Sequence, residues 1–99
     1  MYGLIGKMTA VLGRRDDLIA VLNEGIAGMP GCLSYIIAKD LTDEDTIWVT
    51  EVWESEQSHK EALALPSVRQ AIVKGRPLIA HFGDATVTEP VVGHGLTHA

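Results

Sequence analysis

Three side chains that could carry chemistry lie close together in the sequence: Glu51, Trp53 and His59. Residues 46–53 are rich in β-branched and aromatic residues and are predicted to form a strand, so Glu51 and Trp53 share one of its faces. An imidazole titrates near neutral pH and suits general-base chemistry. A tryptophan offers a flat wall for an aromatic substrate, although a single tryptophan is more often a core residue. We predict His59 as the catalytic base and Trp53 as a substrate-binding residue.

The helical connection after this strand determines where His59 points. A helix is expected to begin near Ser55 or Glu56, which places His59 on the same face as Ala62 and Leu63. Those two residues must face the sheet, so His59 should point inward, into a cavity that the small Ala62 helps to leave open. The alternative is a histidine at the edge of the core, bonded to a backbone carbonyl.

Two further polar side chains are candidates for the same cavity. Glu51 is a carboxylate on an otherwise apolar strand face, where it needs a partner or a raised pKa. It would orient His59 or bind a substrate hydroxyl, or alternatively form a structural ion pair with Arg69 or Lys74. Tyr35, on the expected neighbouring strand, would offer its hydroxyl to the cavity or pack in the core. We predict Glu51 and Tyr35 as substrate-binding residues.

The elements that must position these residues follow the order βαββαβ. Hydrophobic periodicity predicts strands at 2–11, 32–39, 46–53 and 82–89. It predicts one helix at 15–28 and a second that begins at Ser55 or Glu56 and ends at about Leu65, where Pro66 interrupts it. A third helix follows Pro66, with Ser67 as its N-cap and Ile79 on its inward face. This order is that of a ferredoxin-like α+β fold with both helical connections on one face of the sheet. We expect one domain over residues 2–90 and a C-terminal tail at 91–99.

Both faces of the expected strands are apolar. In the third strand, Ile47, Val49 and Trp53 lie opposite Trp48 and Val52. A sheet with one face in water should alternate apolar and polar residues, and the helices can cover only one face. A second copy of the chain is the simplest cover for the other face, so we expect a homodimer. A curved sheet that closes partly on itself is the alternative.

Composition limits the partners. The 99 residues carry a formal net charge of −5, and the eight lysines and arginines are scattered, so neither a nucleic acid nor a membrane is an expected partner. No apolar run approaches the roughly 20 residues that span a bilayer. Cys32 is the single cysteine, which excludes an intramolecular disulfide. We expect a cytoplasmic protein.

The sequence lacks the motifs that bind common cofactors. It contains no glycine-rich phosphate loop, nucleophile elbow, Cys-x-x-Cys pair or dinucleotide fingerprint. His94 and His98 could hold a metal if helical, but Gly93 and Gly95 disfavour a helix there and no third ligand is evident. We therefore expect no metal and no other cofactor.

Two motifs carry a resemblance to a known family. The run MPGCLSY at 29–35 resembles the helix-to-strand junction of the antibiotic biosynthesis monooxygenase domain, and TEVWES at 50–55, followed by Ser58 and His59, resembles its central strand and helix entry. The resemblance covers about residues 2–90. It implies a dimeric α+β barrel, and it implies oxidation of phenols, anthrones or quinols by molecular oxygen without metal or flavin. Other branches of the family degrade haem.

The sequence departs from the family pattern at two places. Many members carry a histidine nine or ten residues after the tryptophan, where this chain has Ala62 and Leu63. The haem-degrading branch also uses an asparagine on the first strand, where this chain has Lys7, Met8 and Thr9. Haem degradation is therefore disfavoured, and His59 is the available base.

The function predicted from the sequence is a cofactor-independent monooxygenase that oxidises a hydroquinone, an anthrone or a related phenol. Its partners would be that aromatic substrate, molecular oxygen and a second copy of the chain. The alternative is a non-catalytic dimer that binds a small molecule or is purely structural, because a shared fold does not determine activity.

Overall fold

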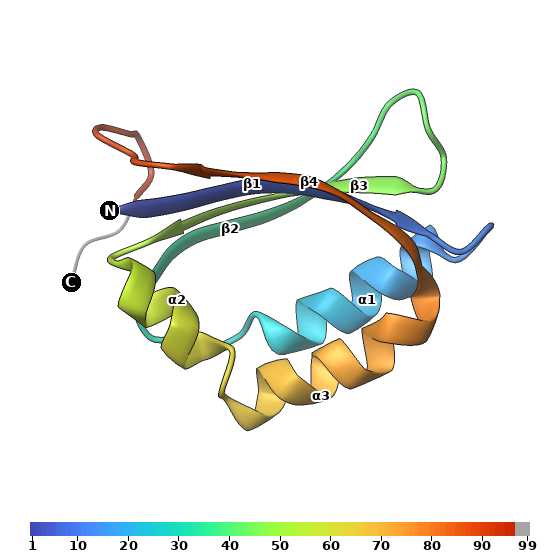
Figure 1. The fold of residues 1–99 in the computed structure, drawn as a ribbon, viewed down its shortest axis with the longest axis horizontal. Helices are drawn as coiled ribbons and strands as arrows, with labels where there is room; N and C mark the ends of the chain where they lie inside the picture. The colour runs from blue at the N-terminus through green and yellow to red at the C-terminus, as the bar shows by residue number, and fades with distance from the viewer. Residues whose placement is uncertain (97–99) are drawn as a thin grey trace.

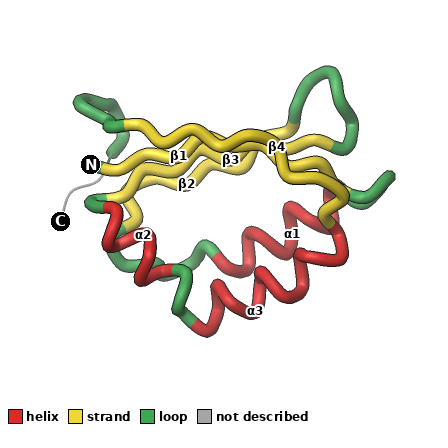
Figure 2. Tube along the Cα trace, in the orientation of Figure 1, coloured by secondary structure: helices red, strands yellow, loops and turns green. Residues whose placement is uncertain are grey.

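The structure, a computed structural model, describes residues 1–96 and contains one antiparallel sheet with its helices on one face (Figure 1). The sheet has the order β2-β3-β1-β4. Figure 2 shows the strands as one layer and the helices as a second layer beneath it. The predicted ferredoxin-like α+β fold is confirmed. The elements are β1 (Tyr2–Ala10), α1 (Arg15–Gly25), β2 (Cys32–Lys39), β3 (Thr46–Trp53), α2 (Glu56–Ala62), α3 (Pro66–Gly75), the 3₁₀ turn η1 (Arg76–Leu78) and β4 (Ile79–Thr88).

The core lies between the sheet and the two long helices, α1 and α3. Leu18 of α1 and Ile47 of β3 are fully buried there, because they meet on the inner face of the sheet. The helices approach each other closely at Gly25, where an added Cβ would lie 2.7 Å from the Cβ of Ala71. Small residues at this crossing therefore let α1 and α3 lie against each other beneath one end of the sheet.

Most predicted boundaries agree with the structure, and the differences have simple causes. Ser55 caps α2, because its hydroxyl accepts the Ser58 backbone N–H at 3.1 Å. The prediction that Ser67 caps α3 is wrong. Pro66 is the first helical residue, a position that suits its fixed φ and missing N–H, so Ser67 lies inside the first turn. Ile79 is the first residue of β4 rather than part of a helix.

The turn between β2 and β3 is held by Asp40. One of its carboxylate oxygens accepts the backbone N–H groups of Thr42 at 2.8 Å and Asp43 at 3.0 Å, and the other accepts the indole N–H of Trp48 at 2.8 Å. These hydrogen bonds, above all the one from Trp48, hold the pKa of Asp40 well below its usual range. The turn thus fixes the hairpin that carries Tyr35 on one strand and Glu51 on the other.

Gly31 lies at the end of the α1–β2 loop and packs against the start of α2. Its φ of +80° is in the left-handed region, and an added Cβ would lie 2.6 Å from the side chain of Ser58. Its carbonyl accepts the Glu54 N–H at 2.8 Å. Because Ser58 precedes His59, this close approach also sets the position of the histidine.

We predict that Gly31→Ala destabilises the protein more than Gly28→Ala. Both glycines have positive φ, but an added Cβ at Gly28 would have no neighbour within 4 Å. Gly28→Ala should therefore cost roughly 1 kcal/mol for the left-handed backbone alone, whereas Gly31→Ala adds a clash with Ser58. Urea denaturation followed by circular dichroism measures both values. Equal losses for the two variants would contradict the proposed packing of the loop on α2.

Candidate functional site

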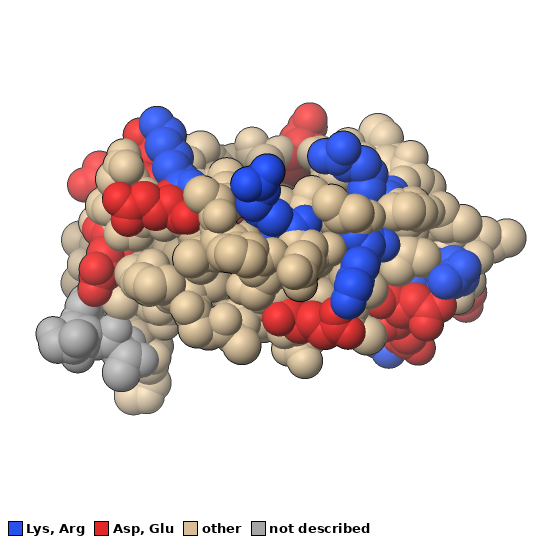
Figure 3. Space-filling model, turned by 90° about the horizontal axis from the view of Figure 1, so that it is seen from below, with Lys and Arg blue, Asp and Glu red and all other residues tan. Residues whose placement is uncertain are grey.

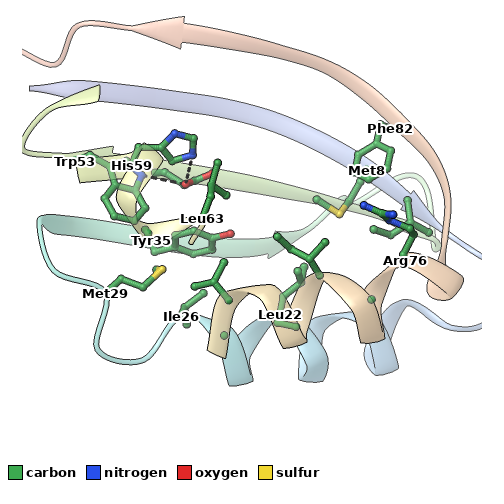
Figure 4. A pocket seen from close by; sticks show the side chains of 18 residues that line it. Met8, Leu22, Ile26, Met29, Tyr35, Trp53, His59, Leu63, Arg76 and Phe82 are labelled. Carbon is green, nitrogen blue, oxygen red and sulfur yellow. Dashed lines mark hydrogen bonds and ion pairs between the residues drawn. The ribbon is translucent and has the colours of Figure 1, made fainter. Parts of the chain in front are cut away.

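A cavity of about 360 Å³ lies between the inner face of the sheet and the helices (Figure 4). This volume falls within the range of small-molecule sites in proteins. The lining is mostly apolar, with residues from every helix and from all four strands. The four residues predicted from the sequence, Tyr35, Glu51, Trp53 and His59, all line it. The fold thus brings the whole predicted set together at one cavity.

Trp53 and Glu51 are joined by a hydrogen bond on the inner face of β3. The indole Nε1–H donates to Glu51 Oε1 at 3.0 Å, and the Trp53 side chain is fully buried. The two residues are two positions apart on one strand, so the pleat directs both side chains toward the helices. A buried indole N–H needs an acceptor, and Glu51 supplies it. This bond fixes one carboxylate oxygen and leaves Oε2 for another partner.

His59 packs its ring against two aromatic side chains at the same end of the cavity. Its ring centroid lies 5.4 Å from that of Trp53 in an edge-on arrangement and 5.6 Å from that of Tyr2. His59 Nε2 lies 3.9 Å from Glu51 Oε1, which is beyond hydrogen-bond distance but close enough for an ion pair if the ring is protonated. Dashed lines in Figure 4 mark these contacts of Trp53 and His59, so the Glu51 carboxylate has both side chains as neighbours.

The electrostatics of this end of the cavity are governed by burial. Burial raises the pKa of Glu51, and the hydrogen bond from Trp53 and the nearby His59 offset only part of that effect. Burial, followed by the charge of Glu51, raises the pKa of the Tyr35 hydroxyl far above its usual value. Tyr35 pairs with Glu51 across β2 and β3, which explains this coupling. Tyr35 therefore stays neutral and can donate a hydrogen bond at any physiological pH.

The alternative role of Glu51 as part of a structural ion pair on α3 is wrong. Lys74 pairs instead with Glu24 of α1 at 3.4 Å, and the contacts of the Glu51 carboxylate are with Trp53 and His59. The lysine points along the surface between the two helices, whereas the carboxylate faces the cavity. Glu51 is thus left available to a ligand.

Sequence reasoning did not nominate several residues that shape the site. Tyr2 stacks near His59, and Arg76 and Phe82 line the far end of the cavity. Tyr2 could have been found from strand pairing, because β1 places it directly opposite Trp53. Arg76 could not, because it follows α3 in a 3₁₀ turn whose direction no periodicity predicts.

The candidate metal pair does not form a site in the described part of the chain. His94 lies beyond β4, and His98 lies outside the described residues. Within residues 1–96, no three His, Cys, Asp or Glu side chains are grouped so that they could hold a metal ion. In the same range, no helix is both long and apolar enough to cross a membrane.

We predict that Glu51→Gln stabilises the protein at neutral pH. The pKa of Glu51 is raised in the folded state, so folding favours its protonated form. The stabilising contribution of this group is complete below the pKa of about 4.3 that it has in the unfolded chain, and it is lost as the pH rises through the pKa of the folded state. A glutamine has no charge to bury and keeps an acceptor for the Trp53 indole, so its advantage should appear above that pH and vanish below it.

The measurement is the free energy of unfolding of both proteins between pH 4 and 8, at one protein concentration. Glu51→Ala is the matched control. It removes both the charge and the acceptor, so it should be less stable than Glu51→Gln by about 1 kcal/mol or more, the usual cost of an unsatisfied buried donor. A glutamine variant that is less stable than the wild type at pH 7 would contradict the assignment of burial as the dominant effect.

Comparison with known proteins agrees with this geometry. The family model for antibiotic biosynthesis monooxygenases matches residues 1–74. A candidate antibiotic biosynthesis monooxygenase from Chloroflexus aurantiacus J-10-fl is 59% identical, with a TM-score of 0.95 over 97% of this chain and 98% of that chain. No curated protein matches the sequence.

More distant solved structures share the fold alone. A candidate antibiotic biosynthesis monooxygenase from Deinococcus radiodurans is 24% identical, with a TM-score of 0.77 over 99% of this chain and all of that chain. Rv0793 from Mycobacterium tuberculosis is 20% identical, with a TM-score of 0.78 over 94% and 97% of the two chains. With three quarters of its length matched by the family model and a 59% identical relative, the chain belongs to the antibiotic biosynthesis monooxygenase family.

Proposed function

We propose that this protein is a monooxygenase that oxidises a hydroquinone, an anthrone or a related phenol with molecular oxygen, without a bound cofactor. The observation that carries the proposal is the apolar cavity that ends in the cluster of Trp53, Glu51 and His59. Membership of the antibiotic biosynthesis monooxygenase family supports the same class of reaction. The substrate class is the one that the family resemblance implies, and the mainly apolar lining with a polar end is compatible with it.

The cavity suits a flat aromatic ring with a hydroxyl at one end. Trp53 provides an aromatic surface in the wall, and most of the other lining residues are aliphatic. At the polar end, the neutral Tyr35 hydroxyl is able to donate a hydrogen bond to a ligand, and Glu51 has one oxygen free of the indole. A substrate hydroxyl or carbonyl would therefore be held by Tyr35 and Glu51 with the ring beside Trp53.

His59 is the proposed general base. A phenolic oxygen placed beside both His59 Nε2 and Glu51 would lie within reach of each, because these two atoms stand 3.9 Å apart with no hydrogen bond between them. Proton transfer to His59 would produce an imidazolium next to the Glu51 carboxyl group, which would stabilise the new positive charge. Positioning and proton removal are the contributions required of the protein.

The reaction balances without an added reductant. Deprotonation of the enol form of an anthrone leaves an electron-rich anion, which passes one electron to oxygen. The resulting substrate radical and superoxide combine to form a carbon–oxygen bond, and protonation gives a hydroperoxide. Loss of water then breaks the O–O and C–H bonds and leaves a carbonyl. One oxygen atom stays in the quinone and the other leaves as water, with all electrons supplied by the substrate.

We predict that metal-stripped protein consumes oxygen with members of a panel of hydroquinones and anthrones, and that His59→Ala lowers kcat roughly a hundredfold or more, as expected for loss of a general base. Trp53→Phe should raise KM, because this substitution removes part of the aromatic wall and the hydrogen bond to Glu51. An oxygen electrode measures both. His81→Ala is the control, because His81 is an exposed histidine outside the cavity and its loss should leave turnover unchanged.

Two results would count against the proposal in different ways. Unchanged turnover of His59→Ala across the pH range would eliminate His59 as the base. No oxygen consumption with any substrate of the panel would defeat the monooxygenase proposal and favour a protein that only binds a small molecule.

We further propose that the protein works as a homodimer through the face of the sheet that the helices leave open (Figure 1). On this face Ile36 of β2, Thr50 of β3, Ile5 of β1 and Thr86 of β4 form one row across the four strands. Ile36 is 54% exposed and Ile5 is 40% exposed. Thr50 is half-buried and the other three side chains are exposed, and such a row of uncharged side chains across a sheet favours cover by a second sheet. A single free thiol, Cys32, favours the cytoplasm as the compartment.

We predict that Ile5→Glu converts a dimer into a monomer, because it would bury an unpaired charge at the centre of the interface. The dissociation constant should rise at least a hundredfold in sedimentation velocity experiments. Leu41→Glu is the matched control: Leu41 is 100% exposed in the turn after β2, away from this row, so a charge there should leave the dimer intact. A wild-type monomer at micromolar concentration would overturn the dimer proposal.

A further inference from the structure

The polar side chains of the cavity lie at opposite ends of it. Tyr35, Glu51 and His59 form one end, and Arg76 stands at the other, next to Met8 (Figure 4). Arg76 is the first residue of η1, directly follows the buried Gly75 and is itself exposed, so its side chain starts at the rim of the cavity. Figure 4 shows the guanidinium group directed back toward Met8 rather than away from the cavity.

Arg76 has no acidic partner among residues 1–96. Lys7, Arg15 and Arg69 have none in this range either, but of these four side chains only Arg76 lines the cavity. The sequence holds 13 acidic and 8 basic residues, so partners are plentiful. On the helix side, some Lys and Arg side chains stand next to Asp or Glu and others are surrounded by uncharged residues (Figure 3). The ion pairs of Lys and Arg in this range are Arg14–Asp17, Lys39–Asp16, Lys60–Glu56 and Lys74–Glu24, and Arg15 binds the carbonyls of the β2–β3 turn. An unpaired guanidinium on a cavity wall is thus free to bind an anion.

The distance between the two ends limits the shape of a ligand that reaches both. Tyr2, which stacks near His59, and Met8, which lies beside Arg76, are both on β1. Six residues of a strand correspond to ~20 Å between their Cα atoms. The side chains at both ends reach inward and shorten this span, but a single phenol ring would still contact one end only. A ligand bound at both ends must be elongated.

We infer that Arg76 forms an anion-binding subsite that selects elongated aromatic substrates with a carboxylate at the end opposite the reacting hydroxyl. A guanidinium group binds a carboxylate through two parallel hydrogen bonds, which fixes the orientation of the bound molecule. That orientation would place the far ring against Trp53 and its hydroxyl beside His59. The inference rests on the proposed function for the reacting end and adds the substrate class at the other end.

The test is equilibrium binding of two probes that cannot react: anthracene-2-carboxylate and the neutral anthracene-2-carboxamide. Their fluorescence gives a dissociation constant for each. The wild type should bind the carboxylate roughly tenfold more tightly than the carboxamide, as expected for a charge-assisted hydrogen bond at a partly exposed site. Arg76→Gln should abolish this difference, and Arg76→Lys should retain part of it because the charge remains.

Arg69→Gln is the control. Arg69 is an exposed arginine on α3 that does not line the cavity, so its loss should leave the preference for the carboxylate unchanged. Equal binding of the two probes to the wild type, or binding of neither probe, would overturn the subsite. The outcome is independent of catalysis: a preference that depends on Arg76 in a protein that consumes no oxygen would keep the subsite and reject the monooxygenase reaction.

Discussion

The buried carboxyl group of Glu51 is the feature on which the rest of the site depends. It is the one ionisable side chain on the inner face of β3, and it is held there by the Trp53 indole at 3.0 Å. Burial of such a group costs free energy unless it has partners, so the fold must place Trp53, Tyr35 and His59 around it. The same constraint keeps Tyr35 neutral and leaves one oxygen of Glu51 for a ligand.

The cavity beside Glu51 exists because the helices do not fill all of the space beneath the sheet. Small residues at the crossing of α1 and α3, Gly25 and Ala71, draw these helices together. Ala62, on the inner side of the short α2, leaves space that a larger side chain would fill. The helix layer therefore covers one face of the sheet but leaves a space beneath it, and the candidate site residues line that space.

The sequence alone predicts the strands, the order of the elements and the residues at the polar end of the cavity. Alternation along β3 is enough to place Glu51 and Trp53 on one face, and helical spacing after Ser55 is enough to turn His59 inward. It does not predict contacts that depend on how elements cross in space. Tyr2 meets His59 only because β1 lies next to β3, and Arg76 reaches the cavity only through the 3₁₀ turn after α3.

We propose that this cavity directs one atom of molecular oxygen into an aromatic substrate. The most direct test is turnover of anthrone by the metal-stripped protein under ¹⁸O₂, followed by mass spectrometry of the anthraquinone. The mechanism predicts one ¹⁸O atom in the new carbonyl group, with the second atom recovered in water. Anthraquinone without ¹⁸O, or turnover that releases hydrogen peroxide in equal amount, would contradict it.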